Sequence, residues 1–200
     1  MRLIIATRNK GKFREIKEIL KGIKIKVVSL DDLGENIKTR EDGKSFLENA
    51  VKKAAAVSRR YPFDLVAADD SGLEVEYLDN RPGVFSKRYS GRGSTDIKNN
   101  LKLLKELEGI AWKERKAKFR CVVALAYGKA IIKKFEGKVS GYINDKSLGK
   151  RGFGYDPVFY LPFHKKTVAQ ISLKKKNEIS HRARAFRKLK KYLAKYLKSN

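Results

Sequence analysis

The stretch Leu65-Val66-Ala67-Ala68-Asp69-Asp70-Ser71-Gly72 joins an apolar run to two adjacent carboxylates, a hydroxyl and a glycine. The apolar run follows the turn-forming residues 61–64 and predicts a short buried strand. The acidic pair is therefore expected at the end of that strand, on the rim of the core. Burying a charged group in such a place costs free energy, so the carboxylates are expected to have a partner or a function. The segment is either a site for a divalent cation or an Asp-Ser-Gly turn that ends the strand.

Hydrophobic periodicity on either side of this stretch predicts an α/β fold with a mixed sheet. Strands are expected at 3–6, 23–27, 73–78, 119–127, 130–135 and 139–143, and helices at 13–20, 44–59, 97–107 and from Ser180 onward. Two of these helices are expected to bury apolar faces made of Phe46, Leu47, Ala50, Ala54 and Val57, and of Ile97, Leu101, Leu104 and Leu107. The pair Gly128-Lys129 suits the turn of a hairpin.

Length and composition indicate a single domain, residues 1–200, with room for a small second lobe. No long uncharged stretch predicts a membrane span, and the apolar segment 3–6 is too short for a signal peptide. Cys121 is the only cysteine, so an internal disulfide is excluded. A reducing cytoplasm is the expected location.

Basic residues dominate the charge, with 48 Lys and Arg against 22 Asp and Glu and a net charge of +26. Such a charge fits a nucleic-acid binder, a protein that captures a small polyanion, or a lysine-rich surface adapted to heat. The basic residues are scattered along the chain, which favours the last two interpretations and predicts no specific nucleic-acid partner.

The loop Thr7-Arg8-Asn9-Lys10-Gly11-Lys12 leads from the first expected strand into a helix. Backbone amides at a helix start favour an anion, and Lys12 could neutralise its charge. The loop is not a P-loop, because it lacks the earlier glycine and the hydroxyl after the lysine. Taken alone, it is either an anion site or an ordinary turn.

A second candidate site combines Asp70 with Glu41, which precedes the helix expected at 44–59. Mg²⁺ prefers oxygen ligands and a phosphate, so these two carboxylates could hold one ion. The alternative is a solvated helix face on which Glu48, Asn49 and Lys53 form ordinary charge pairs.

Two further segments suit a nucleotide. Glycines flank Phe153 in Gly152-Phe153-Gly154-Tyr155-Asp156-Pro157, where an exposed ring could stack on a base and Asp156 could accept base N–H groups, unless the aromatic rings pack inward. Lys176 and Ser180-His181-Arg182 add cationic donors, or else a helix cap with surface residues. No Cys/His cluster suits zinc, and one Ser-His pair does not make a hydrolase triad.

Six segments in this order resemble the inosine triphosphate pyrophosphatase family, which removes aberrant purine nucleoside triphosphates. They are Thr7 to Lys12, Glu41-Asp42-Gly43-Lys44-Ser45-Phe46-Leu47-Glu48-Asn49-Ala50, Ala68-Asp69-Asp70-Ser71-Gly72-Leu73, Pro82-Gly83-Val84-Phe85-Ser86-Lys87-Arg88-Tyr89, the Phe153 segment and Ser180-His181-Arg182. Each motif is modest alone, but together they span most of the chain.

The resemblance implies Mg²⁺-dependent cleavage between the α and β phosphates of ITP, dITP and XTP, giving a monophosphate and pyrophosphate. It implies a homodimer whose mixed, partly long twisted sheet is flanked by helices, with two lobes around a nucleotide-binding cleft. Asp70 would bind the metal and activate water, with Glu41, or its rival Glu35, as second ligand. The implied substrate contacts are Thr7, Arg8, Asn9, Lys10, Gly11, Lys12, Lys53 and Ser71 for the phosphates, Phe153, Gly154, Tyr155, Asp156 and Lys176 for the nucleotide, and His181 and Arg182 for the base.

Two alternatives stay open from the sequence. The first is a nucleotide pyrophosphatase with a different base preference, which would keep the metal site and change the base pocket. The second is a basic nucleic-acid-binding module, motivated by the net charge of +26. The second does not explain an acidic pair on a phosphate-binding face.

Overall fold

The computed structural model describes residues 1–37 and 39–199, in which seven strands form one sheet in the order β2-β1-β3-β4-β5-β6-β7. The strands are β1 (Leu3–Ile5), β2 (Val27–Ser29), β3 (Leu65–Val75), β4 (Lys116–Tyr127), β5 (Ala130–Ile143), β6 (Phe159–Leu161) and β7 (Lys166–Thr167). The α-helices are α1 (Lys10–Ile19), α2 (Phe46–Arg60), α3 (Asp96–Glu106), α4 (Leu173–Ile179) and α5 (His181–Ser199). β1 runs parallel to β2 and β3, whereas β6 is antiparallel to β5 and β7, so the predicted mixed α/β fold is confirmed.

The chain divides into two compact units. Unit 1 comprises Met1–Ser71, Cys121–Gly137 and His181–Asn200, and unit 2 comprises Gly72–Arg120 and Lys138–Ser180. β3, β4 and β5 are long strands that contribute residues to both units.

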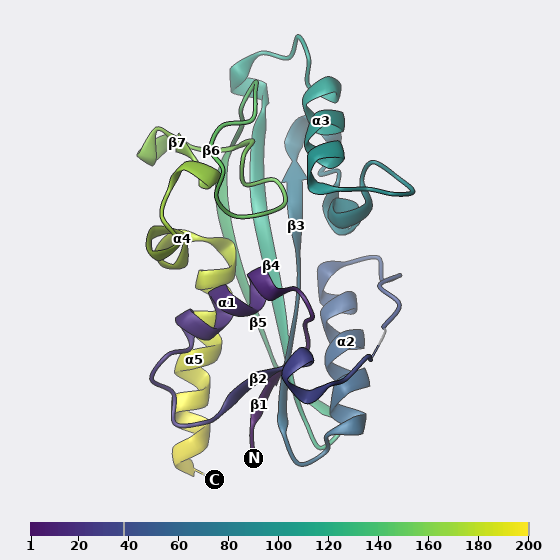
Figure 1. Cartoon of the computed structure of the whole chain (residues 1–200), viewed down its shortest axis with the longest axis vertical. Coiled ribbons are helices and arrows are strands. Elements are labelled where there is room, and N and C mark those ends of the chain that lie inside the picture. Colours follow the sequence, from purple (N-terminus) through teal and green to yellow (C-terminus); the bar gives the residue numbers. More distant parts are fainter. Residues whose placement is uncertain (38, 200) are drawn as a thin grey trace. The chain divides into compact units, whose positions relative to one another are not determined.

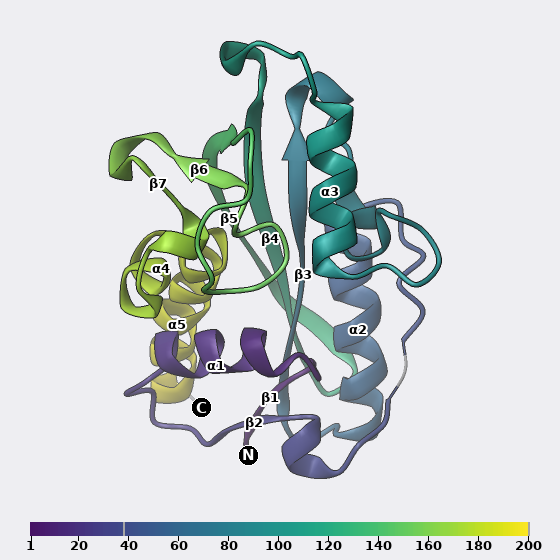
Figure 2. The same ribbon diagram turned by 45° about the horizontal axis from the view of Figure 1, so that its top comes forward.

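Unit 1 has helices on both faces of its part of the sheet (Figure 1). Successive strand residues point to opposite faces, so Leu3 and Ile5 pack with α1 and α5 in one core cluster. Ile4 belongs to a second cluster, with Ala50 and Ala54 of α2. Figure 2 shows the same separation of α2 from α1 and α5. Strands buried on both faces explain the continuous apolar runs of the sequence.

Unit 2 has one core cluster, built from the remaining halves of the long strands and from α3. Phe119 and Phe159 pack with their ring centroids 4.4 Å apart. Leu103 and Leu107, from α3 and its C-cap, are fully buried in this cluster.

Helix faces and strand limits differ from prediction in several places. Ile97 and Leu101 are 73% and 62% exposed, and α3 instead buries Asn99, Asn100 and Leu103. Asn99 is buried because its side-chain amide forms hydrogen bonds with the backbone of Ser86, Lys87 and Ser90. The spacing of apolar residues gives no sign of such hydrogen bonds. Leu47 is also exposed rather than buried.

The strand expected at 23–27 begins only at Val27, and the preceding isoleucines pack against the core from irregular chain. The two strands expected at 130–135 and 139–143 are one strand, β5. β3 ends at Val75, so the strand expected at 73–78 is its last part followed by a 3₁₀ turn, Glu76–Leu78.

Across residues 1–37 and 39–199, no helix combines the length and the apolar character that a membrane crossing needs.

Candidate functional site

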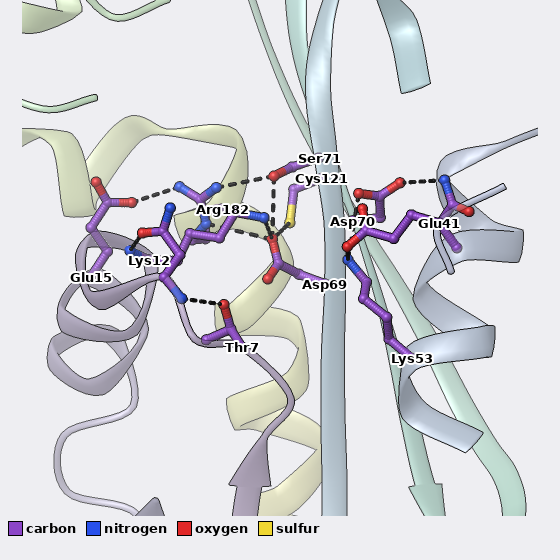
Figure 3. A network of polar contacts seen from close by, with 12 residues as sticks. Thr7, Lys12, Glu15, Glu41, Lys53, Asp69, Asp70, Ser71, Cys121 and Arg182 are labelled. Atoms are coloured by element: carbon purple, nitrogen blue, oxygen red, sulfur yellow. Dashed lines mark hydrogen bonds and ion pairs between the residues drawn. The ribbon is translucent and has the colours of Figure 1, made fainter. Parts of the chain in front are cut away.

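Asp69 and Asp70 lie in the middle of β3, not at its end. The strand continues through Ser71 and Gly72, so the predicted Asp-Ser-Gly turn is wrong. β3 lies between β1 and β4 in the sheet, and both carboxylates have cationic partners inside unit 1. Because strand residues alternate, the two side chains point to opposite sides of β3 (Figure 3).

Asp69 faces a cationic cluster and is 2% exposed. Its Oδ2 lies 3.1 Å from Lys12 Nζ and 3.7 Å from Arg182 Nε, and it accepts a 3.2 Å hydrogen bond from Ser71 Oγ. Burial alone would raise the pKa of Asp69, but Lys12 and Arg182 outweigh it and hold that pKa far below its ordinary value. Asp69 is therefore an ionised anchor for two cations.

Cys121 lies next to this cluster, with Sγ 4.0 Å from Asp69 Oδ2. Burial and the nearby Asp69 raise the pKa of its thiol, so Cys121 is a neutral core residue.

Arg182 has an acidic partner that the sequence reasoning missed. Its Nη1 donates a 2.6 Å hydrogen bond to Glu15 Oε2, and its Nη2 donates one of 3.0 Å to Ser71 Oγ. Glu15 is 3% exposed on α1. One signal could have revealed it: the acid lies on the same helix face as Ile16 and Ile19.

Asp70 faces α2 and the loop before it. Its Oδ2 accepts a 3.0 Å hydrogen bond from Asn49 Nδ2, and its Oδ1 lies 3.5 Å from Lys53 Nζ. The same ammonium lies 3.5 Å from Glu41 Oε1, so two carboxylates from separate segments share one cation. Burial raises the pKa of Asp70, and Lys53 only partly offsets it.

The loop carrying Glu41 is fixed by Asn49. Its Oδ1 accepts a 2.8 Å hydrogen bond from Gly43 N, and a Cβ on Gly43 would come within 2.6 Å of that oxygen. Ser45 caps α2 by accepting a hydrogen bond from Glu48 N, which sets the first turn that presents Asn49.

Glu35, the rival metal ligand, makes other contacts. It accepts a 2.7 Å hydrogen bond from Tyr61 OH and lies 3.5 Å from Arg60 Nε, at the C-terminal end of α2. Among the residues described, no three His, Cys, Asp or Glu side chains form a metal-binding group. Mg²⁺ is held in proteins by one or two carboxylates together with substrate phosphates, so Glu41 and Asp70 are the residues here that could hold it.

The segment Thr7 to Lys12 is half loop and half helix. Asn9 is the N-cap of α1 and accepts a 2.9 Å hydrogen bond from Lys12 N, so Lys10 and Gly11 lie in the first turn. Thr7 Oγ1 accepts a 3.2 Å hydrogen bond from Asn9 N. Arg8 points elsewhere, with its Nε 3.3 Å from Asp31 Oδ1.

Unit 2 carries the other predicted nucleotide contacts. Asp156 accepts hydrogen bonds from Phe153 N at 2.9 Å and from Lys176 Nζ, and this ammonium lies 4.6 Å from the centroid of the Phe153 ring. Gly152 has a φ of +79°, and an added Cβ there would collide with the Asp156 carboxylate. Phe153 is half-buried, whereas Tyr155 packs inward and donates to Ser86 O at 2.9 Å.

Helix α3 holds the same loop from another side. Asp96 Oδ2 accepts a 2.7 Å hydrogen bond from Gly154 N, and Asn100 Nδ2 donates one of 3.0 Å to Gly154 O. The structure thus brings together Phe153, Asp156 and Lys176 within unit 2. Within unit 1 it brings together Glu41, Lys53 and Asp70, and separately Lys12, Ser71 and Arg182. His181 is 5% exposed and begins α5.

Known proteins match this chain over nearly its whole length. The model of the Ham1 family matches residues 3–192. A dITP/XTP pyrophosphatase of Geobacter sulfurreducens is 46% identical over 192 residues, 96% of each chain. One of Caldanaerobacter subterraneus is 44% identical over 200 residues, the whole of both chains. The Ham1 protein of Staphylococcus aureus superposes with a TM-score of 0.87 at 38% identity, covering 98% of this chain and 100% of that one. The chain therefore belongs to the Ham1 family.

Proposed function

We propose that this protein hydrolyses dITP, ITP and XTP to the nucleoside monophosphate and pyrophosphate with the help of Mg²⁺. Relatives 44–46% identical over 96% or more of both chains carry the name dITP/XTP pyrophosphatase. The observation that carries the proposal is the pair of carboxylates, Glu41 and Asp70, each 3.5 Å from the single ammonium of Lys53. The two carboxylates could bind a metal ion, and the neighbouring cationic side chains could bind the phosphates that the metal contacts.

The acidic side of β3 suits the metal and the attacking water. Glu41 and Asp70 would hold Mg²⁺, which when bound neutralises phosphate charge and polarises the bond to be cleaved. The Asp70 carboxylate would orient water and accept its proton, and Asn49 fixes that carboxylate from behind.

The opposite side of β3 suits the phosphates. The amides at the start of α1 and the Lys12 ammonium would bind the triphosphate, with Thr7, Asn9, Lys10 and Gly11 around it. Lys53 would reach the triphosphate from the Asp70 side of the strand. Ser71 would turn its hydroxyl from Asp69 to donate to a phosphate oxygen. The resemblance implies that Arg8 also contacts the phosphates, which would require its guanidinium to break the ion pair with Asp31.

The base contacts are proposed from the resemblance. Phe153 would stack on the purine, and Asp156 would act by holding Phe153 N and Lys176 in place. Gly154 and Tyr155 complete this loop. His181 and Arg182 would donate to the 6-oxo group, and a 6-amino group would leave these donors unpaired, which disfavours ATP.

A product assay tests the activity. The protein is incubated with Mg²⁺ and dITP, ITP, XTP, ATP or GTP, and pyrophosphate is resolved from orthophosphate. We expect pyrophosphate from the first three and little product from ATP. Orthophosphate as first product would overturn the cleavage position, and faster turnover of ATP or GTP than of the first three would show a different base preference.

The Asp70→Asn variant tests the proposed catalytic carboxylate. Loss of the metal ligand and proton acceptor should lower kcat by about 10³-fold. Asp145→Asn, an exposed change in unit 2, is the control and should leave kcat unchanged. Near-normal turnover by a folded Asp70→Asn protein would remove Asp70 from the mechanism.

The same proposal includes a homodimer, supported by the resemblance to the pyrophosphatase family, and a cytoplasmic location, supported by the single cysteine. Light scattering of the purified protein tests the first, because a monomer and a dimer differ twofold in mass.

A further inference from the structure

Glu15 is a buried acid that the proposed reaction does not use. It lies on α1, three residues beyond Lys12, and only 3% of it is exposed. A buried carboxylate is costly unless it is paired and hydrogen-bonded. Its partner is Arg182 on α5, itself 2% exposed.

Arg182 lies at the centre of a chain of charges inside unit 1. Its guanidinium donates to Glu15 Oε2 at 2.6 Å and to Ser71 Oγ at 3.0 Å, and its Nε lies 3.7 Å from Asp69 Oδ2 (Figure 3). Asp69 in turn lies 3.1 Å from Lys12 Nζ. The order along this chain is Glu15, Arg182, Asp69 and Lys12, alternating in sign.

Two proposed phosphate contacts, Ser71 and Lys12, are held by this chain of charges. Ser71 Oγ is fixed by Arg182, and the Lys12 ammonium is fixed by Asp69. Without Glu15, the Asp69 carboxylate would still attract Arg182, and we expect the guanidinium to move toward it. Such a movement withdraws the donor from Ser71 and competes with Lys12 for Asp69.

We propose that Glu15 is a positioning residue, which holds Arg182 so that Ser71 and Lys12 are aligned for the polyphosphate of the substrate. The role rests on the proposed function, since it assigns these two groups to the phosphates. Glu15 does not touch the substrate; it acts through the guanidinium. A purely structural tether between α1 and α5 is the competing explanation.

The Glu15→Gln variant tests the role because it removes the charge and keeps the shape. Glu18→Gln is the matched control, since Glu18 lies on the exposed side of the same helix. With dITP and Mg²⁺, we expect kcat/KM of Glu15→Gln to fall by about 10²-fold, as for other small misplacements of reactive groups. Glu18→Gln should match the wild type.

A double-mutant cycle separates positioning from tethering. If Glu15 acts through Ser71, the effects of Glu15→Gln and Ser71→Ala on kcat/KM will be strongly non-additive. A tether alone predicts a lower unfolding temperature for Glu15→Gln with unchanged kcat and KM at 25 °C. That result, or strictly additive effects in the cycle, would overturn the proposal.

Two further measurements cover the remaining outcomes. If Glu15→Gln does not fold, Glu15→Asp keeps the charge on a shorter side chain, and we expect a loss of about tenfold in kcat/KM.

If the wild type cleaves none of the nucleotides, the proposed function fails, and binding of inorganic tripolyphosphate is measured by calorimetry instead. Glu15→Gln should then bind it about tenfold more weakly than Glu18→Gln, and equal binding would overturn the positioning role.

Discussion

Adjacent residues in this protein have opposite electrostatic environments. Asp69 is surrounded by Lys12 and Arg182, which lower its pKa despite complete burial. Burial raises the pKa of Asp70, its neighbour, which has Lys53 and Asn49 as partners. Two carboxylates whose environments separate their pKa values have different roles. Here Asp69 anchors cations, and under the proposed function Asp70 would hold the metal and accept a proton.

A third carboxylate, Asp64, gives a test of stability against pH. It accepts hydrogen bonds from Arg2 N at 2.7 Å and Arg2 Nη2 at 2.6 Å. Burial would raise the pKa of Asp64, but these bonds lower it below its ordinary 3.8. A lowered folded-state pKa gives stability that is present above the unfolded value and lost as pH falls through the folded value.

We therefore expect Asp64→Asn to lower the urea midpoint at pH 7, and the difference from wild type to shrink once the pH falls below 3.8. Asp145→Asn serves as the exposed control. A difference that stays constant across the acidic range would show that the Asp64 charge does not contribute.

Helix α2 delivers two groups to the same carboxylate. Asn49 and Lys53 are four residues apart, so both lie on one helix face, next to Asp70. The Lys53 ammonium lies between Glu41 and Asp70, where it must compete with a divalent cation for their oxygens.

Lys53→Met should therefore strengthen the binding of Mn²⁺ in the absence of nucleotide, by about tenfold, which corresponds to about 1.4 kcal/mol. Spin-resonance titration of the free ion measures this directly. Lys52→Met removes the same charge from the neighbouring position, which pairs with Asp42, and should change Mn²⁺ binding less. Weaker Mn²⁺ binding by Lys53→Met would contradict the competition.

The first turn of α5 packs closely against β5 at a glycine. An added Cβ at Gly137 would collide with the carbonyl of His181 and the amide of Ala185. Close packing of this kind makes even one extra methyl destabilising.

Gly137→Ala should lower the free energy of unfolding by about 2 kcal/mol and reduce activity, because it displaces the turn that carries His181 and Arg182. Urea denaturation measures the first effect and the dITP assay the second. Lys134→Ala on the exposed side of the same strand is the control. Wild-type stability in Gly137→Ala would show that the contact relaxes freely.

At the scale of the whole molecule, the net charge of +26 is expected to attract polyanionic substrates. Raising KCl from about 50 mM to about 500 mM shortens the Debye length several-fold. We expect kcat/KM for dITP to fall about tenfold over this range, mainly through KM, while kcat changes little. Steady-state kinetics check this, and an unchanged KM would show that the charge serves another purpose.

Local signals in the sequence predicted much of the fold. Apolar runs predicted β1, the first part of β3, β4 and β5, and Gly128-Lys129 predicted the hairpin. Residues 44–59 and 97–107 predicted helices close to those observed, whereas β6, β7 and α4 were not predicted. The burial of Asn99 on α3 was not predictable, because its side chain forms hydrogen bonds with the backbone of a separate segment that precedes the helix. The apolar spacing within the helix carries no information about these bonds.

By itself, the sequence determined which residues are candidates for chemistry: Asp70, Glu41, Lys53 and the Thr7 to Lys12 segment all follow from residue type and order. Only the tertiary structure decided that β3 runs on through Asp69 and Asp70 and places them on opposite sides. It also decided that Arg182 pairs with Glu15, 167 positions away. Periodicity and turn propensity act between near neighbours, whereas ion pairs between distant segments form only when packing brings them together.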